Sequence, residues 1–272
     1  MPTLVSAAHI RRGRLHVLAY HGISAHGGDP LSLTPAQFAA QMTWLHDNGA
    51  HVVSLVEGLA CLRRGDHRGP LVALTFDDGY ADFGDHAAPV LAQYGFPATL
   101  FIVSDKIGQA ADWQGAPRGR PLLGLDALRE LAQLGHCIGS HTATHARLTR
   151  LTAVRLDAEI RKSKARLAEA TGVVPAAFAY PYGDFGRRER DAVAAAGYLC
   201  ACSIRGWSNA AATDPFALRR IEMWGGYSMH EFAALMTARL KWPRLTRAGR
   251  HIAGGIQNAL VRDHPESPFT HH

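Results

Sequence analysis

The sequence predicts an α/β fold, and the best match to its pattern is one (β/α) barrel domain of seven or eight parallel strands. Short apolar, β-branched segments alternate with longer segments of helical periodicity along the 272 residues. Repeated strand–helix alternation implies parallel strands joined by right-handed crossovers. The strand segments are almost continuously apolar, which indicates burial on both faces. Periodicity does not decide whether the sheet closes, so a doubly wound open sheet is the alternative.

Eight segments have the length and composition of buried strands: 16–21, 51–55, 71–78, 98–105, 136–141, 177–182, 198–204 and 218–224. Seven segments between or after them have helical periodicity: 34–48, 56–64, 83–94, 124–135, 152–171, 186–196 and 229–241. Residues 106–123, rich in Gly, Pro and Ala, are predicted to be a loop.

Two of the helices carry additional local signals. Thr34, Pro35 and Gln37 form a capping box with proline at the first helical position, which predicts a helix start. In the 152–171 segment, apolar residues recur at helical spacing on one face, and Asp157 and Arg161 form a favourable i,i+4 pair.

The domain boundaries follow from these elements and from charge. We expect an N-terminal extension over 1–14, the barrel over 15–241 and a basic, irregular appendage over 242–272. The chain carries a net charge of +6. Residues 239–250 are basic, and we expect them either to form a solvated face or to contact an anionic membrane peripherally; no nucleic acid partner is expected.

No secretory signal peptide is expected, because Arg11, Arg12 and Arg14 interrupt the region where an apolar run would be needed. No stretch of about 18 apolar residues occurs, so no transmembrane helix is expected. The expected location is therefore the cytoplasm, with the inner face of the membrane as a variant.

The first group of chemically informative residues is Thr-Phe-Asp-Asp-Gly at 75–79. A buried strand runs directly into two adjacent carboxylates, and neighbours in a regular strand point to opposite faces. Asp77 and Asp78 can serve one site only where the strand stops and the backbone turns, and Gly79 allows that turn. A plain Asp-Asp-Gly turn is the alternative.

The second group is Ser-His-Thr-Ala-Thr-His at 140–145. His141 ends a predicted strand, and His145 can face the same metal ion if it lies on a helical turn. By itself the pair slightly favours two solvated loop histidines over a metal site. Two histidines and one carboxylate together form a three-ligand site with open positions, which is typical of hydrolytic metal centres. The second aspartate is then available as a base.

With Phe-Ala-Tyr-Pro-Tyr-Gly at 178–183 and Leu148 after the histidine pair, these motifs resemble, in order and spacing, those of the polysaccharide deacetylases. These are the NodB-homology proteins of carbohydrate esterase family 4, and the resemblance covers roughly residues 15–225. It implies a distorted (β/α) barrel, a zinc ion or another divalent metal such as Co²⁺ or Ni²⁺, and removal of an N-acetyl group from an amino sugar.

The resemblance also implies residue roles. Asp77 matches the general base that acts on a water at the metal, and Asp78, His141 and His145 match the metal ligands. Tyr182 matches the residue whose backbone N–H helps to hold the oxyanion. Such roles fit the needs of amide hydrolysis, which requires an activated water, a stabilised oxyanion and a proton for the departing amine.

Two features depart from the family pattern. Ala179 stands where the third motif usually has an arginine that orients the base, and Arg219 or Arg220 in the last predicted strand is a candidate substitute. The late Leu-x-His motif that supplies the general acid is not evident. His21, at the end of the first strand, is the expected acid, which is similar to the bacterial exopolysaccharide and poly-N-acetylglucosamine deacetylases; His230 is a rival.

We therefore expect a metal-dependent hydrolase that deacetylates an amino sugar in a glycan or glycoconjugate. Two alternatives remain open: a deacylase of a small or lipid-linked sugar precursor, and a catalytically silent carbohydrate-binding barrel. The expected partner in each case is a carbohydrate, and for the two enzymes it carries N-acetyl groups.

Overall fold

Eight parallel strands form one curved sheet in the computed structural model, which describes residues 10–25, 29–65 and 68–237. The strand order is β10-β1-β5-β6-β7-β8-β9, and β4 pairs with the first half of β5. The strands are β1 (Leu15–Tyr20), β4 (His51–Val53), β5 (Leu71–Phe76), β6 (Ala98–Ile102), β7 (Cys137–Ser140), β8 (Ala177–Ala179), β9 (Cys200–Cys202) and β10 (Ile221–Glu222).

The sheet closes only through a short contact, which makes the barrel distorted. Leu218, ahead of β10, bridges to Cys202 of β9: its N–H donates to Ala201 O at 2.9 Å, and its carbonyl accepts from Ser203 N at 2.9 Å. A few residues later β10 pairs with β1. The predicted single-domain barrel of parallel strands is confirmed, and the open-sheet alternative is not favoured.

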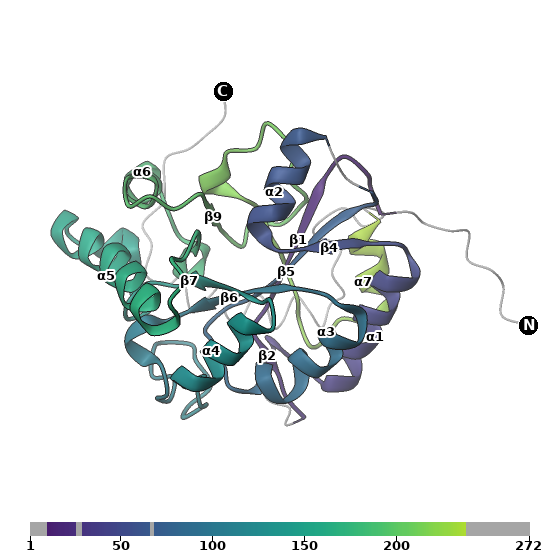
Figure 1. Cartoon of the computed structure of the whole chain (residues 1–272), viewed down its shortest axis with the longest axis horizontal. Helices are drawn as coiled ribbons and strands as arrows, with labels where there is room; N and C mark the ends of the chain where they lie inside the picture. Colours follow the sequence, from purple (N-terminus) through teal and green to yellow (C-terminus); the bar gives the residue numbers. More distant parts are fainter. Residues whose placement is uncertain (1–9, 26–28, 66–67, 238–272) are drawn as a thin grey trace, which may run out of the picture.

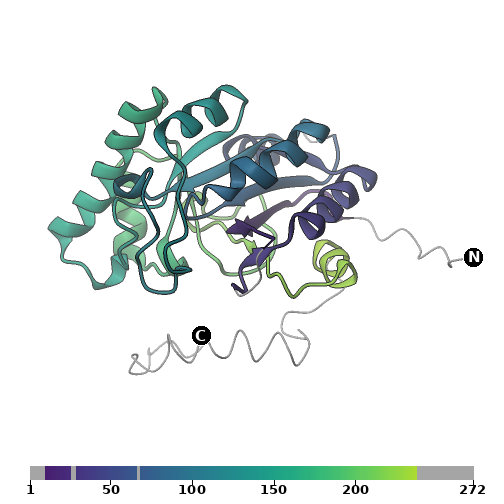
Figure 2. The same cartoon turned by 90° about the horizontal axis from the view of Figure 1, so that it is seen from below.

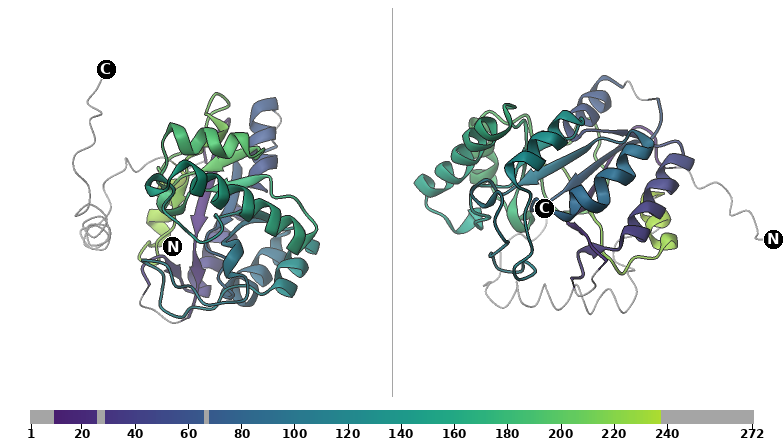
Figure 3. Two further views of the ribbon diagram at one scale, coloured as in Figure 1. Left: turned by 90° about the vertical axis from the view of Figure 1, so that its left-hand side faces the viewer. Right: turned by 60° about the horizontal axis from the view of Figure 1, so that its bottom comes forward.

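The described residues form seven α-helices, of which the first six connect strands and the seventh follows β10: α1 (Pro35–Asp47), α2 (Leu55–Arg64), α3 (Ala88–Tyr94), α4 (Leu125–Gln133), α5 (Ala153–Thr171), α6 (Arg187–Ala195) and α7 (Met229–Met236). Helices α5 and α6 lie at one end of the sheet and α1, α3 and α7 at the other (Figure 1). The views in Figure 2 and Figure 3 show α7 beside α1, where Trp44 packs edge-on against Phe232 at 5.5 Å between ring centroids.

Local signals set several element boundaries. The predicted capping box of α1 is present: Gln37 N donates to Thr34 Oγ1 at 3.2 Å, and Thr34 N donates to Gln37 Oε1 at 2.9 Å. The expected Asp157–Arg161 pair forms at 2.7 Å. The strand expected at 51–55 stops at Val53, because Ser54 caps the N-terminus of α2 by accepting from Glu57 N.

Other differences come from tertiary pairing. The strands expected at 198–204 and 218–224 are shortened to Cys200–Cys202 and Ile221–Glu222. A small second sheet pairs β2 (Gly22–Ile23) with β3 (Ser32–Leu33), and a π-helical turn (Phe83–Ala87) precedes α3. These short pairings lack the length that periodicity needs to reveal them.

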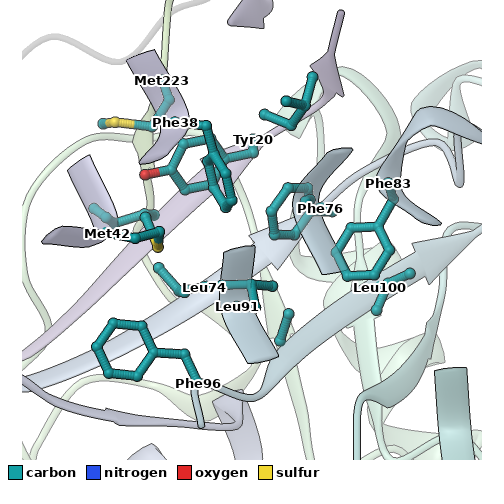
Figure 4. Close-up of a cluster of buried hydrophobic side chains, with 14 of the residues drawn as sticks. Tyr20, Phe38, Met42, Leu74, Phe76, Phe83, Leu91, Phe96, Leu100 and Met223 are labelled. Atoms are coloured by element: carbon teal, nitrogen blue, oxygen red, sulfur yellow. The ribbon is translucent and has the colours of Figure 1, made fainter. Parts of the chain in front are cut away.

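Alternating side chains give the sheet two buried faces. On the outer face, Tyr20, Phe38, Phe76 and Phe83 form a ring cluster with centroid separations of 4.7–5.8 Å (Figure 4). On the inner face, apolar residues of β1, β5, β8 and β9 form one buried cluster with the apolar side of α2. The expected burial on both faces is confirmed, with every residue of β1 and β5 buried.

The expected boundaries at 14/15 and 241/242 stay predictions, since most of the first segment and all of 242–272 lie outside the described residues. The segment 239–250, expected to contact a membrane, lies outside them as well. Within the described residues, no helix combines the length and apolar character needed to cross a membrane.

Candidate metal centre

Strand alternation gathers polar residues at the carboxyl ends of the inner face. Each of β1, β5 and β7 is followed directly by a polar residue, namely His21, Asp77 and His141. Parallel strands present their carboxyl ends at the same rim of a barrel, where (β/α) barrels build their sites. Asp77 N donates to Tyr20 O and His141 N donates to Ile102 O, both at 2.9 Å, so each residue continues the ladder of its strand.

Asp78 reaches the same rim through a backbone turn. A regular strand would direct it away from Asp77, but Asp78 has φ 73° and Gly79 has φ 77°, both left-handed. The predicted turn after Asp77 is therefore present, and it starts one residue before the glycine. Both carboxylates are buried, with 3% exposure for Asp77 and 6% for Asp78.

His145 is positioned by an irregular loop, which is one of the two possibilities, a loop or a helix start, that its place after the strand allows. Thr142 has φ 69° and His145 has φ 63°, and His145 N donates to Thr142 Oγ1 at 2.9 Å. This reversal directs the imidazole of His145 back towards His141, at 4.8 Å between ring centroids. Both histidines are buried.

The side chains of Asp78, His141 and His145 form a cluster suited to a metal ion. Asp78 Oδ1 lies 3.6 Å from His141 Nε2 and 3.3 Å from His145 Nε2, and one ligand atom from each residue lies within 4.8 Å of the other two. Tetrahedral ligands at about 2.0–2.1 Å from a zinc ion are themselves about 3.3–3.4 Å apart. The two distances from Asp78 Oδ1 are therefore close to the spacing that such an ion requires.

The protonation states of His141 and Asp78 also suit metal binding. Burial lowers the pKa of His141 to about 4, so its imidazole is neutral near pH 7. Its Nδ1 lies 2.9 Å from Ala179 O, and donating to that carbonyl leaves the Nε2 lone pair facing Asp78. Asp78 Oδ1 is buried without a hydrogen-bond partner. Burial opposes ionisation of Asp78, but the adjacent histidines hold its pKa well below its usual range. Two imidazoles and a carboxylate suit zinc, cobalt or nickel.

Asp77 is held separately, by Arg220. Arg220 Nη1 and Nη2 donate to Asp77 Oδ1 and Oδ2, each at 2.6 Å, and the arginine is fully buried. Arg220 also donates to Ser203 O at 3.0 Å and to Thr75 Oγ1 at 3.1 Å. Burial alone would raise the pKa of Asp77, but the charge of Arg220 keeps it below its usual value. Of the two candidate substitutes for the missing arginine, Arg220 contacts Asp77 and Arg219 is exposed.

His21 lies beside this pair. Its Nε2 is 4.0 Å from Asp77 Oδ2, and its side chain is 13% exposed. Glu222, two residues after Arg220 and thus on the same side of the strand, interacts electrostatically with His21; burial raises the pKa of Glu222, and His21 and Arg220 act against that rise. The rival His230 is an exposed residue of α7.

Aromatic residues from two loops enclose the open side of the cluster. Trp113 stacks on His145 with 4.6 Å between centroids, and Tyr182 contacts the same ring edge-on at 4.8 Å. Tyr182 has φ 62°, and its hydroxyl donates to Gln114 O at 3.3 Å, which links the two loops. Trp207, which also lies in a loop, is 41% exposed.

Arg120 links the Trp113 loop to the segment that contains β2 and β3. It pairs with Asp82, with Asp29 at 3.1 Å and with Ser32 Oγ at 2.7 Å. The guanidinium lies directly over Gly22, where a Cβ would come within 1.9 Å of Arg120 Nη2. One half-buried cation thus connects the Trp113 loop to the residue that follows His21.

The fold and the cluster together define a (β/α)-barrel protein with a preformed Asp-His-His site at the carboxyl ends of its strands. The family model for polysaccharide deacetylases matches residues 64–201, about half of the chain. YxkH of Bacillus subtilis (strain 168), a protein itself assigned to the polysaccharide deacetylases, is 30% identical over 222 residues, which are 81% of this chain and 75% of YxkH. The chain belongs to the polysaccharide deacetylase family, whose members are metalloenzymes acting on N-acetylated carbohydrates.

Two further matches are informative. The poly-β-1,6-N-acetyl-D-glucosamine N-deacetylase of Staphylococcus aureus (strain MSSA476) is 32% identical over 78 residues, which are 29% of this chain and 27% of that enzyme. The structure of the Streptococcus pyogenes deacetylase PplD in complex with acetate aligns with a TM-score of 0.73 at 24% identity, covering 82% of this chain and 98% of PplD. The second match shows the fold.

Sequence reasoning missed Glu222 and Arg120, and it left Arg220 undecided between two neighbours. Arg220 and Glu222 are two apart in a strand, so alternation could have placed both on one face. For Arg120, in a loop of irregular sequence, no local signal was available.

Proposed function

We propose that this protein is a metal-dependent N-deacetylase that hydrolyses the acetamido group of an amino sugar in a glycan or glycoconjugate. The observation that carries the proposal is a division between two adjacent carboxylates. Asp78 faces the imidazoles of His141 and His145, whereas Asp77 is held by Arg220 and lies next to His21. A purely structural turn would not need this separation.

The three-ligand set would be Asp78, His141 and His145. A divalent cation held there would supply Lewis-acid polarisation of the acetyl carbonyl and of the attacking water. The remaining work falls to the protein's own groups. Asp77, kept ionised by Arg220, accepts the proton of the water as the water attacks the carbonyl carbon. The backbone N–H of Tyr182 stabilises the negative charge that develops on the carbonyl oxygen.

Breakdown of the tetrahedral intermediate requires a proton on the departing nitrogen. His21 is the proposed donor, because its Nε2 lies 4.0 Å from the Asp77 carboxylate at the same rim. The products are acetate and the free amine of the sugar. Trp113, stacked on His145 and half-buried, provides an apolar wall against which a sugar ring can pack.

The test is release of acetate from short chito-oligomers, β-1,6-linked N-acetylglucosamine oligomers, and nucleotide- and lipid-linked N-acetylated amino sugars. The β-1,6 arm is included because of the similarity to the S. aureus enzyme. We expect activity that chelator abolishes and added Zn²⁺, Co²⁺ or Ni²⁺ restores. Activity that survives chelation would refute the metal mechanism, and sugar binding without turnover would favour the silent-barrel alternative.

Variants identify the residues. We expect Asp77→Asn to lose turnover while retaining metal, and His141→Ala to lose both. Asp47→Asn and His46→Ala are matched controls, since these side chains are 65% and 59% exposed at the end of α1. Wild-type turnover in Asp77→Asn would exclude Asp77 as the base.

A further inference from the structure

The loop that carries His145 has an unfavourable backbone. Thr142 and His145 both adopt left-handed φ values, 69° and 63°, and neither is glycine. Each such residue costs about 1–3 kcal/mol and persists only when its surroundings over-determine the conformation. The groups that hold residues 142–145 therefore decide where the His145 imidazole lies.

One carboxylate outside the proposed site, that of Glu159, accepts three hydrogen bonds from this loop. Glu159 Oε2 accepts from Ala143 N at 3.0 Å and from Thr144 N at 2.9 Å, and Glu159 Oε1 accepts from Thr144 Oγ1 at 2.8 Å. Two successive backbone N–H groups that converge on one oxygen form an anion-binding nest. Hydrogen bonds to a charged acceptor are about twice as strong as neutral ones.

The other side of the loop is fixed by the chain after β6. Ser104 N donates to Thr142 O at 3.1 Å, and Asp105 N donates to Ala143 O at 2.9 Å. These bonds hold the first half of the loop. Glu159 holds the second half, the part that precedes His145.

Glu159 is itself placed by a rigid support. It lies on α5 next to Ile160, which is fully buried, and one turn later Ser163 of the same helix is within 2.6 Å of Ser140 of β7, oxygen to oxygen. The helix is thus joined to the strand that delivers His141. The same element connects the two histidines, one through the strand and the other through the Glu159 carboxylate.

We propose that Glu159 is a positioning residue that preorganises His145 for metal binding and so sets the affinity of the Asp78–His141–His145 cluster for a divalent cation. The inference rests on the proposed function. Without the carboxylate, two N–H donors and a hydroxyl lose their acceptor, and the left-handed loop loses the contacts that offset its strain. The loop then relaxes, and His145 Nε2 leaves its place 3.3 Å from Asp78 Oδ1.

The chemistry distinguishes glutamate from glutamine here. All three loop partners are hydrogen-bond donors in the observed arrangement, and the carboxylate offers only acceptors. Glutamine retains one acceptor oxygen for the two N–H groups, and its NH₂ group can pair with the Thr144 hydroxyl only if that hydroxyl turns to accept. Glu159→Gln should therefore be intermediate between wild type and Glu159→Ala.

The experiment measures the dissociation constants of Zn²⁺ and Co²⁺ for the metal-free full chain by competition with a chromophoric chelator. Removing a residue that orients a ligand typically weakens metal affinity about 10–100-fold. We expect a loss of that size for Glu159→Ala, a smaller loss for Glu159→Gln, and none for Glu169→Ala, an exposed glutamate of the same helix. The visible spectrum of bound Co²⁺ should also change in Glu159→Ala.

A merely structural role would lower the unfolding free energy of the metal-free protein without changing either dissociation constant, and that result would overturn the inference. If Glu159→Ala does not fold, Glu159→Gln carries the same comparison. Failure of the wild type to bind one equivalent of either ion would refute the metal site of the proposed function, and the inference with it. Wild-type binding that Glu159→Ala leaves intact refutes only the inference.

Discussion

Replacing Arg220 by methionine should strongly lower the unfolding free energy of the protein. Both hydrogen bonds to Asp77 are 2.6 Å long, the arginine is fully buried and the aspartate is 3% exposed. Removing one partner of such a pair costs about 3–5 kcal/mol, because the other charge stays buried and uncompensated. Natural proteins have about 5–15 kcal/mol of stability in total, so the loss is a large fraction.

The sign of the pH dependence gives a sharper test. In the wild type the pKa of Asp77 is lowered, so the pair stabilises the protein above the usual aspartate pKa, and this contribution is lost as pH falls through the folded value. In Arg220→Met, burial remains and the cation is gone, so the pKa of Asp77 rises above its usual range. The variant can then relieve its buried charge by protonation. The stability difference should therefore be greatest near pH 7 and should shrink as pH falls towards 4.

Urea unfolding of both proteins at several pH values measures this difference, and Arg219→Met, the exposed neighbour, is the matched control. A double-mutant cycle with Asp77→Asn isolates the pair. In the acetate-release assay, the acidic limb of the kcat/KM profile should move to higher pH in Arg220→Met. A loss below 1 kcal/mol, or one that does not vary with pH, would refute the reasoning.

Two other substitutions test the support of the site and the buried core. Gly22→Ala should lower the unfolding free energy by about 1–3 kcal/mol, because the added Cβ would come within 1.9 Å of Arg120 Nη2 and force Arg120 out of its place. Gly84→Ala, which has no atom near the added carbon, should leave the unfolding free energy unchanged. Equal stabilities of the two variants in urea would contradict this reasoning. Burial lowers the pKa of His16 to about 4, so the unfolded chain takes up a proton first, and stability should fall by about 3 kcal/mol as pH drops from about 6.5 to about 4. His16→Gln should reduce that fall, whereas the exposed His46→Gln should leave it unchanged; identical pH profiles for the two variants would count against the assignment.

The sequence predicted the fold class because its signals are local. Continuous apolar strands and the Thr34 capping box need only neighbouring residues, and both are present in the structure. The two groups of the site were predicted for the same reason: each lies where a strand ends, and the carboxyl ends of parallel strands share one rim. For His145 the sequence left open a loop or a helix start after the strand; the structure has a loop, which turns through left-handed residues.

Short tertiary pairings were beyond local reasoning. The strands β2 and β3 have two residues each, too few for any periodic pattern, and they form because their backbones meet. The strand predicted at 218–224 is longer than the observed β10, because the pairing partner of this segment changes along its length. Its segment pairs first with β9 through Leu218 and then with β1 through Ile221, so it changes partners where the barrel closes.

By itself the sequence determined which residues could carry the chemistry: two carboxylates at a strand end, two histidines after another strand, and a histidine after the first. Only the tertiary structure decided what holds them. Arg220 reaches Asp77 across 143 positions of sequence, and Glu159 reaches Thr144 from a separate helix. The reason is physical: a side chain's pKa and orientation depend on which charges and donors lie within a few ångströms, and barrel closure sets those neighbours.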